Sequence, residues 1–519
     1  MRRQWRQQRI VMMIFVFMLA VGLLLGRIFY LQLWRGKEFA ARAVAQRTGS
    51  YVYASGRGQI FDRNGISLHA KLEPISALAR EELAAYHLPL EVMSNYTLQE
   101  EIRYYAGSLA THVTGYIKKP RNPLQPQNGL SGLERSFNEE LWGTPSAVGV
   151  TVDAKGKAVP GLGMMEWQYQ HFRRPYNVIT TIDAKLQEIV ERVAAGKIKK
   201  GAVIFLDPAS GDILALASYP RLPVEKLYQG GITAEELKQL EVNNPYLNRA
   251  IMQYPTGSVF KVILAAAALE QNVPEPEGLY VCKGRYELGD TVFRCYQDTA
   301  HGVLDLHAAL ALSCNGYFID LALRLGKDVV LEMARRFKLG QPTGIPLGQE
   351  AAGNLPTLYD LRYGGDVANM ALGQGKVAAT PLQLARVMAI IANNGRDVYP
   401  RLVAKVVDKN GNPVKIFPVQ YGARIISPEI SAALQKMLMT VVEEGTAQYA
   451  KSHLYQAAGK SGTAEVAGTD YNHSWFATIV KTEKRQMVAV VFIEEWRPLN
   501  DTASAVFKNI METVIKENV

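Results

Sequence analysis

The longest uninterrupted apolar stretch of the chain lies close to its N-terminus. Residues 10–26 carry no charged side chain, and apolar residues continue beyond Arg27 as far as residue 33. Such a run is long enough for a membrane-spanning helix, and Tyr30 and Trp34 are aromatic residues suited to the membrane interface. A cleaved signal peptide is the alternative, but no small-x-small cleavage site follows the run. We therefore expect an uncleaved signal-anchor at 10–33.

Positive charge is concentrated just before this run. Residues 1–9 contain four arginines and no acidic residue. By the positive-inside rule, these arginines place the N-terminus in the cytoplasm. We therefore expect a single-pass membrane protein in which everything after the anchor is extracytoplasmic.

The pattern beyond the anchor divides into two regions. Residues 34–175 alternate short apolar runs with turn signals such as Asp62-Arg63-Asn64-Gly65 and Lys119-Pro120-Arg121-Asn122-Pro123, which is typical of an irregular, β-rich module. Longer periodic segments begin after Arg174-Pro175. We expect a non-catalytic β-rich region at 34–175 and a larger domain at 176–519.

The start of the larger region predicts a helix followed by a β-hairpin. The β-branched run Asn177–Ile182 precedes Asp183, a good N-cap for the helical pattern 184–195. Two apolar strands, Gly201–Leu206 and Ile213–Ser218, then flank a short turn-forming loop.

A second hairpin is predicted near the C-terminus. Its strands are Trp475–Val480 and Met487–Ile493, and a helix capped at Asp501 follows. The pattern between the two hairpins is mostly helical. We therefore expect an α/β (α+β) domain in which one mainly antiparallel sheet is assembled from both ends of the region and flanked by helices.

Composition and charge narrow the class of protein. The 519 residues are 48% hydrophobic and 20% charged, which excludes a disordered chain, and the net charge of +10 suits an anionic partner. No zinc-finger spacing, aromatic RNA-binding run or glycine-rich phosphate loop is present. We therefore expect no nucleic-acid partner.

The cysteines and histidines indicate no metal. Cys282 and Cys295 flank a short glycine-containing segment and are compatible either with a disulfide or with reduced buried thiols, and Cys314 lies in an apolar stretch. The eight histidines do not fall at metal-ligand spacing. Lining of the cleft by His301 and His473 is one alternative, and a structural hydrogen-bonding role is the one that we expect.

Residues 254–261 carry the clearest chemical signal. They place Ser258 at the start of a predicted helix and Lys261 three residues later, so that both side chains emerge on one helix face. A serine hydroxyl needs a base to become a nucleophile, and a lysine serves as that base only when burial or a nearby cation lowers its pKa from about 10.4. Ser-x-x-Lys alone is a weak signal, because it also occurs on ordinary surface helices.

Two further motifs strengthen this interpretation. Ser313-Cys314-Asn315 follows Lys261 by 52 residues within an apolar helical pattern, and Lys460-Ser461-Gly462-Thr463 precedes the second hairpin. Ser313 is suited to relay a proton, and Asn315 to hold the lysine and the substrate backbone. We expect Lys460 to supply positive potential for a substrate carboxylate.

The residues after Lys460 complete the expected binding strand. The hydroxyls of Ser461 and Thr463 are expected to bind the substrate carboxylate. Gly462 is expected to let the strand approach the substrate closely, because it has no Cβ. Gln374 either contacts the site through its Gly-Gln-Gly turn or is purely structural.

The three motifs, in this order, resemble those of the class B penicillin-binding proteins, the D,D-transpeptidases of bacterial cell-wall synthesis. Cys314 stands where that family pattern often has Asp, and Ser461 where it has Thr. The similarity extends through several other segments: 56–65, 129–134, 201–220, 248–250, 373–375, 380–383 and 472–476. No counterpart of a glycosyltransferase domain is present, which argues against the bifunctional class A enzymes.

The resemblance implies a serine penicillin-recognising transpeptidase fold at 176–519 on a pedestal at 34–175. It implies peptidoglycan stem peptides as substrates, covalent inhibition by β-lactam antibiotics, no cofactor and an oxyanion hole formed by the backbone N–H groups of Ser258 and Thr463. It also implies a partner in the lipid bilayer of the bacterial cell membrane, a polytopic glycan polymerase of the shape, elongation, division and sporulation family. A β-lactamase, a D,D-carboxypeptidase and a non-catalytic divisome scaffold are the alternatives.

Overall fold

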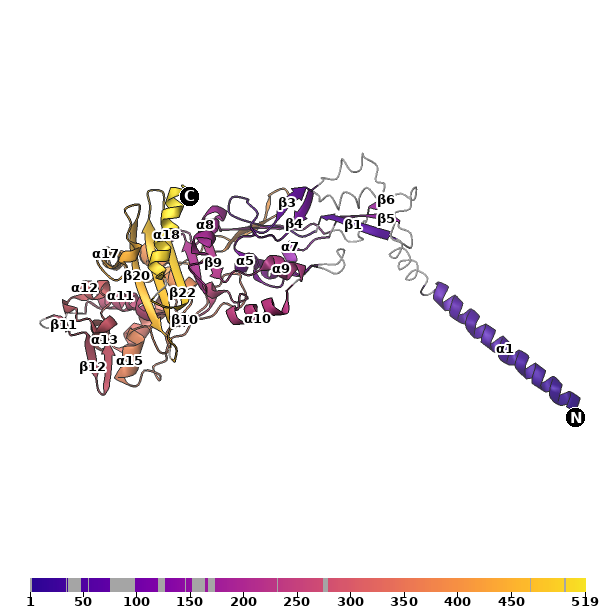
Figure 1. Ribbon diagram of the computed structural model, residues 1–519, viewed down its shortest axis with the longest axis horizontal. Helices are drawn as coiled ribbons and strands as arrows, with labels where there is room; N and C mark the ends of the chain where they lie inside the picture. The colour runs from indigo at the N-terminus through magenta and orange to yellow at the C-terminus, as the bar shows by residue number, and fades with distance from the viewer. Residues whose placement is uncertain are drawn as a thin grey trace. The chain divides into compact units, whose positions relative to one another are not determined.

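The structure is a computed structural model of the whole chain, shown in Figure 1. The residues that it describes are 2–33, 35, 48–54, 56–74, 99–119, 127–144, 146–151, 164–166, 173–230, 232–273, 279–466, 468–498 and 501–519. Most of the predicted turn at 119–123 lies outside these residues.

The chain forms two compact units. The first comprises Met1–Ser55, Leu72–Glu101 and Thr144–Phe172, and the second comprises Gly56–Lys71, Ile102–Gly143 and Arg173–Val519. Segments 56–71 and 102–143, which precede Arg174-Pro175 in the sequence, therefore belong by their contacts to the same unit as the C-terminal region.

The first unit begins with the predicted apolar helix. Helix α1 spans Arg2–Leu33 and contains a 23-residue stretch, Ile10–Gln32, of mean hydropathy 2.5 that is long enough to cross a membrane. The same unit holds a three-stranded sheet of order β1-β5-β6, formed by Thr48–Ala54, Ser146–Thr151 and Met164–Glu166. The helix fits the expected single-pass membrane anchor.

A five-stranded antiparallel sheet forms the centre of the second unit (Figure 1). Its order is β20-β21-β22-β8-β9, and its strands are Gln456–Glu465, Asn472–Lys481, Gln486–Trp496, Gly201–Leu206 and Ile213–Tyr219. Strand β22 pairs with β8, for example Val490 with Ile204. The prediction of one sheet built from both ends of the region is therefore confirmed.

Helices pack on this sheet. Helix α8 (Ala184–Ala194) and helix α18 (Ala503–Lys516) contact each other and the sheet strands. Helix α16 (Pro381–Ala392) packs on β8, β21 and β22, and eleven of its twelve residues are buried. A helix that is buried on nearly all sides in this way is a core helix rather than a surface helix.

The two predicted helix caps differ in outcome. Asp183 caps α8 as predicted, because its side chain accepts hydrogen bonds from the backbone N–H groups of Lys185 and Leu186. The prediction for the last helix was wrong by one residue. Thr502 caps α18 by accepting from Ala505 N, and the preceding aspartate instead forms a 2.7 Å ion pair with a lysine.

A second, four-stranded sheet joins early and late parts of the second unit. Its order is β18-β17-β7-β2, formed by Pro413–Ile416, Val403–Val407, Asn177–Thr180 and Ile60–Phe61. Strand β2 runs parallel to β7, with Ile60 opposite Val178. The segment that contains β2 is thereby tied to the start of the C-terminal region.

A buried ionic cluster joins two of the segments that resemble the family, 56–65 and 129–134. Glu134 has a completely buried side chain and accepts from Arg57 Nε at 2.6 Å, from Arg103 Nε at 2.9 Å and from the Tyr104 hydroxyl at 3.0 Å. The two guanidinium groups hold the pKa of Glu134 at about 2, although burial alone would raise it. The cluster therefore ties segments 56–71 and 102–143 together through charge.

The remaining described helices are α5 (Thr111–Thr114), α6 (Gly132–Ser136), α7 (Asn138–Leu141), α9 (Val224–Gln229), α10 (Ala234–Asn243), α11 (Lys261–Gln271), α12 (Leu306–Ala311), α13 (Asn315–Leu325), α14 (Lys327–Arg336), α15 (Gly364–Ala371) and α17 (Pro428–Glu443). The 3-10 turns are η1 (Arg249–Ile251), η2 (Gly257–Phe260), η3 (Tyr296–Asp298) and η4 (Gln448–Ala450). The remaining strands are β3 (Lys71–Pro74), β4 (Gln99–Ile102), β10 (Tyr254–Pro255), β11 (Tyr280–Cys282), β12 (Arg285–Leu288), β13 (Thr291–Arg294), β14 (Gly302–Leu304), β15 (Ala378–Ala379), β16 (Arg396–Val398) and β19 (Tyr421–Arg424).

Candidate active site

The candidate nucleophile lies at the start of a helix, where the sequence predicts it. Ser258 is in the 3-10 turn η2, which leads directly into α11, and its side chain is partly exposed. Lys261, one turn later, is completely buried. The serine is thus accessible to a ligand while the lysine is held away from water.

Lys261 is held by the Ser-Cys-Asn segment. Its Nζ donates to Asn315 Oδ1 at 2.6 Å, to the backbone oxygen of Ser313 at 2.8 Å and to the Ser313 hydroxyl at 3.3 Å. Burial lowers the pKa of Lys261 from 10.5 to about 8. An appreciable fraction of the side chain is therefore an unprotonated amine near neutral pH.

Ser313 lies in a break between two helices and Asn315 is the first residue of the second helix, so the expectation that the whole motif lies inside a helical pattern was wrong for Ser313. Helix α12 ends before them and α13 begins at Asn315, with Cys314 as its N-cap. Ser313 has a left-handed backbone with φ of 53°, which is uncommon for a residue other than glycine. This conformation turns the chain so that Ser313 and Asn315 both reach Lys261.

Strand β20 presents alternate side chains to solvent and to the interior. Lys460 and Gly462 are buried, Ser461 is half-buried and Thr463 is exposed. The Ser461 hydroxyl lies 2.8 Å from the hydroxyl of Thr446. The hydroxyl groups of Ser461 and Thr463 on this strand, and of Thr446 in the loop after α17, therefore lie on the accessible side.

Lys460 is completely buried, and its Nζ donates to the backbone oxygen of Ser461 at 2.9 Å. Burial and the nearby charge of Lys261 both lower the pKa of Lys460. The charge of Lys261 thus disfavours protonation of Lys460. The observed position allows Lys460 to act on a ligand through its electrostatic potential.

Two glycines allow β20 to approach the nucleophile turn. A Cβ on Gly462 would lie 2.9 Å from Val259 Cγ2, so this glycine makes room for the η2 turn, whereas the sequence suggested room for substrate. Gly257 has φ of +54°, and a Cβ there would lie 2.7 Å from the backbone oxygen of Thr463. Ser258 and Thr463 are consequently next to this close approach of two backbones.

The turn that contains Gln374 supports the nucleophile turn from another direction. Gly257 N donates to the backbone oxygen of Gly373 at 3.0 Å, and a Cβ on Gly373 would collide with Gly257 at 2.1 Å. Gln374 is partly exposed, and its backbone N–H donates to Asn369. The turn therefore has a clear structural role, and contact of the Gln374 side chain with a ligand stays a prediction.

Sequence reasoning missed Thr446, which follows the Gly445 at the end of α17. Its backbone N–H donates to the oxygen of Ala311, and a Cβ on Gly445 would lie 2.2 Å from that same oxygen. The Gly-Thr pair at residues 445–446 was the available signal in the sequence. Only the contact with Ser461 gives this threonine a place in the site.

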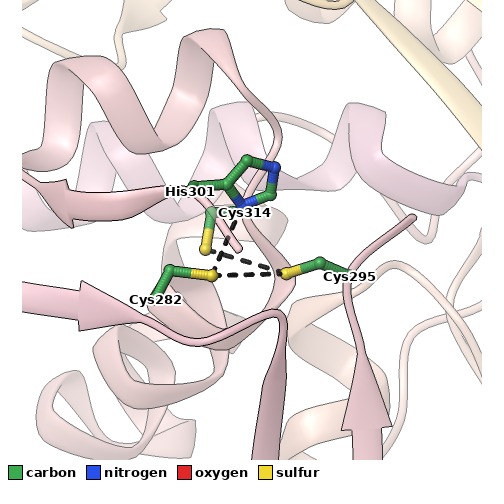
Figure 2. A group of neighbouring side chains, drawn as sticks. All are labelled: Cys282, Cys295, His301 and Cys314. Carbon is green, nitrogen blue, oxygen red and sulfur yellow. Dashed lines mark hydrogen bonds between the residues drawn. The ribbon is translucent and has the colours of Figure 1, made fainter. Parts of the chain in front are cut away.

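The cysteines do not form the disulfide that the sequence left open. The Sγ atoms of Cys282 and Cys295 are 3.7 Å apart, and all three cysteines are free (Figure 2). His301 lies beside Cys282, with Nδ1 at 3.4 Å from Sγ, so it is not an isolated cleft histidine. His473 is buried and packs edge-on against Tyr254, which agrees with a structural role.

The arrangement is suited to acyl transfer through a serine ester. It combines an accessible hydroxyl at a helix start, a buried amine with a lowered pKa and hydroxyl groups on an adjacent strand. Within the described residues, the hydrogen-bond partners of Lys261 are neutral oxygens. Neutral partners leave the amine free to accept a proton.

Residues 201–515 match the penicillin-binding protein transpeptidase domain family. The chain is 27% identical to the peptidoglycan D,D-transpeptidase MrdA of Acinetobacter baumannii, over 92% of this chain and 84% of that protein. It is similar to the crystal structure of penicillin-binding protein 3 from Mycobacterium tuberculosis complexed with aztreonam (25% identity, TM-score 0.65, 91% and 98% of the two chains). A chain in a structure of a peptidoglycan synthase complex is also similar (25% identity, TM-score 0.69, 97% of each chain).

The family match covers more than half of the chain and includes all three motifs around Ser258, Ser313 and Lys460. The chain is therefore a member of the penicillin-binding protein transpeptidase family, and its relatives place it among the class B enzymes.

Proposed function

We propose that this protein is a membrane-anchored peptidoglycan D,D-transpeptidase that cross-links stem peptides through an acyl-enzyme on Ser258. The observation that carries the proposal is the position of Lys261, a buried amine held by Ser313 and Asn315 one helical turn from an accessible serine. The names of the relatives, which are D,D-transpeptidases and penicillin-binding proteins, support the choice of reaction.

In the first half-reaction, the free amine of Lys261 accepts the proton of the Ser258 hydroxyl. The oxygen then forms a bond to the penultimate carbonyl carbon of a D-Ala-D-Ala stem peptide. The backbone N–H groups of Ser258 and Thr463 stabilise the oxyanion, each worth about 2.7–4 kcal/mol. The peptide C–N bond breaks, and Ser313 passes the proton from Lys261 to the leaving D-Ala.

In the second half-reaction, an amine of a neighbouring strand attacks the ester carbonyl. It loses a proton to Lys261 through Ser313, a new amide bond forms and Ser258 leaves with its proton restored. Asn315 positions both the lysine and the substrate backbone. The reaction needs no cofactor, because the acyl group passes from one amine to another with no net redox change.

The substrate carboxylate binds along β20. Ser461 and Thr463 donate hydrogen bonds from their hydroxyls, Thr446 extends this row, and Lys460 adds positive potential from behind the strand. We expect the Gln374 side chain to contact the same substrate from its Gly-Gln-Gly turn. Benzylpenicillin, which mimics the D-Ala-D-Ala amide, enters the same first half-reaction and stays attached to Ser258.

The N-terminal helix anchors the enzyme in the cell membrane with its basic end in the cytoplasm and the catalytic domain outside. Residues 34–175 serve as the pedestal and 176–519 as the transpeptidase domain. The similarity to a chain of a peptidoglycan synthase complex supports a polytopic glycan polymerase of the shape, elongation, division and sporulation family as the membrane partner.

Labelling with benzylpenicillin tests the proposal. The full chain in detergent should gain one penicilloyl group, and peptide mapping should locate it on Ser258, with no label on Ser258→Ala. Label elsewhere, or complete turnover of the adduct within seconds as in a β-lactamase, would contradict the proposal. Product analysis with a stem-peptide donor and an amine acceptor then separates cross-linking from D,D-carboxypeptidase hydrolysis.

A further inference from the structure

A buried tryptophan of the central sheet binds the segment that leads into the nucleophile turn. Trp475 lies on β21 and is 1% exposed, and its indole Nε1 donates to the backbone oxygen of Pro255 at 2.9 Å. Pro255 ends β10, three positions before Ser258. The indole therefore holds the chain immediately ahead of the proposed nucleophile, although no step of the proposed reaction uses it.

Trp475 is also paired with the strand that carries the second proposed oxyanion donor. In the antiparallel register of β20 and β21, it lies opposite Gly462, the neighbour of Thr463. Residues directly opposite each other in such a pair point to the same face of the sheet. On this face, the glycine therefore leaves space and the tryptophan beside it supplies a hydrogen bond.

The nucleophile turn fills the space that Gly462 leaves. A Cβ on Gly462 would lie 2.9 Å from Val259 Cγ2 and 3.1 Å from the backbone oxygen of Thr256, which are on either side of Ser258 in the turn. The turn is thus packed directly on β20. A small shift of the turn would change the separation between the backbone N–H groups of Ser258 and Thr463.

The indole is itself fixed by its aromatic neighbours. Its ring lies 4.2 Å from that of Phe492 on β22, and the Tyr254 ring lies 4.3 Å from the same phenylalanine. All three side chains are buried. A side chain whose rotamer is locked by packing in this way can hold the chain that it binds in one position.

The other hydrogen bonds of the turn come from a different direction. Gly257 N donates to the backbone oxygen of Gly373 at 3.0 Å, and Thr256 Oγ1 donates to the same oxygen at 3.4 Å. These bonds join the turn to the Gly-Gln-Gly segment. The bond from Trp475 joins it instead to the sheet that carries Thr463.

We propose that Trp475 is a positioning residue, which sets the separation of the backbone N–H groups of Ser258 and Thr463 through its hydrogen bond to Pro255. This role rests on the proposed acyl transfer at Ser258, with these two groups as oxyanion donors. Both donors remain when the indole N–H is removed, so the loss should be smaller than the roughly 10²–10³-fold that follows deletion of one donor. It should fall on the rate constants and not on ligand binding, because the oxyanion exists only after attack.

Trp475→Phe in the full chain, purified in detergent, tests this role, because phenylalanine stays aromatic and buried but has no N–H. We expect the first-order rate constant of acylation by a fluorescent penicillin to fall about 10-fold or more, with the dissociation constant of the noncovalent complex within about twofold of wild type. Hydrolysis of the penicilloyl ester passes through a similar oxyanion, so it should slow by a similar factor.

The final yield of adduct separates positioning from a purely structural role. Positioning predicts about one adduct per chain, formed slowly. A structural role alone would reduce the fraction of competent protein, so the yield would fall while the rate constants stayed at wild-type values, and this result would overturn the proposal.

Trp496→Phe is the matched control. Trp496 is a second buried tryptophan of the central sheet, and its indole donates to the backbone oxygen of Asp501 at 3.1 Å, away from the nucleophile turn. This variant should keep both rate constants within about twofold of wild type. An equal loss in Trp496→Phe would overturn the proposal, because it would show a general effect on the sheet.

A second variant covers the case in which Trp475→Phe does not fold. Site-specific replacement of Trp475 by benzothienylalanine keeps the shape of the indole and puts sulfur in place of the N–H, and the same losses are expected. Wild-type rate constants in either folded variant would overturn the proposal alone. A wild-type chain that forms no penicilloyl adduct on Ser258 would instead contradict the proposed function, and the role of Trp475 with it.

Discussion

Replacement of Lys261 by arginine tests whether this lysine acts as the base. With a pKa of about 8, roughly one side chain in ten is a free amine at pH 7, whereas a lysine with the ordinary value of 10.5 would give about one in 3,000. Arginine keeps the positive charge but cannot deprotonate at this pH. We therefore expect Lys261→Arg to slow acylation by at least about 100-fold, or about 2.7 kcal/mol in activation free energy.

The pH dependence of the acylation rate shows which protonation state of Lys261 is active. Since the unprotonated lysine is the active form, the wild-type acylation rate should rise about 10-fold per pH unit below pH 8 and level off above it. Stopped-flow measurement of second-order acylation rates with a fluorescent penicillin provides both profiles. A Lys261→Arg rate within 10-fold of wild type at pH 7, or an inflection near pH 8 that survives in the variant, would refute the assignment of the base.

The control for this experiment must be a lysine outside the site. Lys436 is exposed on α17, and Lys436→Arg should leave the acylation rate within about twofold of wild type. From sequence alone, Lys460→Arg is the natural comparison, with a smaller loss expected because only charge is needed. Burial of Lys460 changes that choice, because a larger guanidinium would disturb packing there as it would at the equally buried Lys261. The pH profile, rather than the size of the loss alone, therefore identifies the base.

Four further outcomes are expected. Glu134→Gln should lower the free energy of unfolding by about 3–5 kcal/mol, because it removes the buried carboxylate that pairs with both Arg57 and Arg103; an unchanged melting temperature would contradict this. The free energy of unfolding should fall as the pH drops from 6.5 toward 4, by about 2.7 kcal/mol per pH unit near pH 5. The reason is that His69 and His112 have folded pKa values of about 3 and about 4, so near pH 5 they bind protons only on unfolding. Chemical denaturation at several pH values should show this slope, and a flat profile would contradict it. Gly462→Ala should slow acylation at least about 10-fold with a melting temperature within a few degrees of wild type, because its Cβ would lie 2.9 Å from Val259, and a wild-type rate would show that the turn can yield. Removal of residues 1–33 should leave acylation within about twofold, and a folded but unreactive fragment would show that the anchor helps to build the site.

Local features of the chain were predictable because they depend on neighbouring residues. The apolar run of α1, the two hairpins and the Asp183 cap follow from hydropathy, turn residues and side-chain oxygens at fixed spacing. The error at the last cap has the same origin. Aspartate and threonine both cap helices well, and sequence alone does not distinguish two adjacent candidates.

Ser258, Lys261 and the two later motifs were recognisable as chemistry for the same reason. Their residue types and order carry the signal, and the resemblance to a known family gave them roles. Their mutual contacts are a different matter, because Ser313 and Asn315 lie more than 50 residues from Lys261 and reach it only through the left-handed turn at Ser313.

The sequence by itself therefore determined the apolar N-terminal helix, the central sheet and the three motifs of the active site. Tertiary structure alone decided how far the pKa of Lys261 falls, since this depends on burial by distant segments. It also decided that Gly462 packs on the nucleophile turn, and that His301 lies beside three cysteines that come from separate segments of the chain. The physical reason is that helices, strands and caps depend on residues close together in the sequence. Burial and the meeting of distant side chains depend instead on which remote segments pack together in the folded chain.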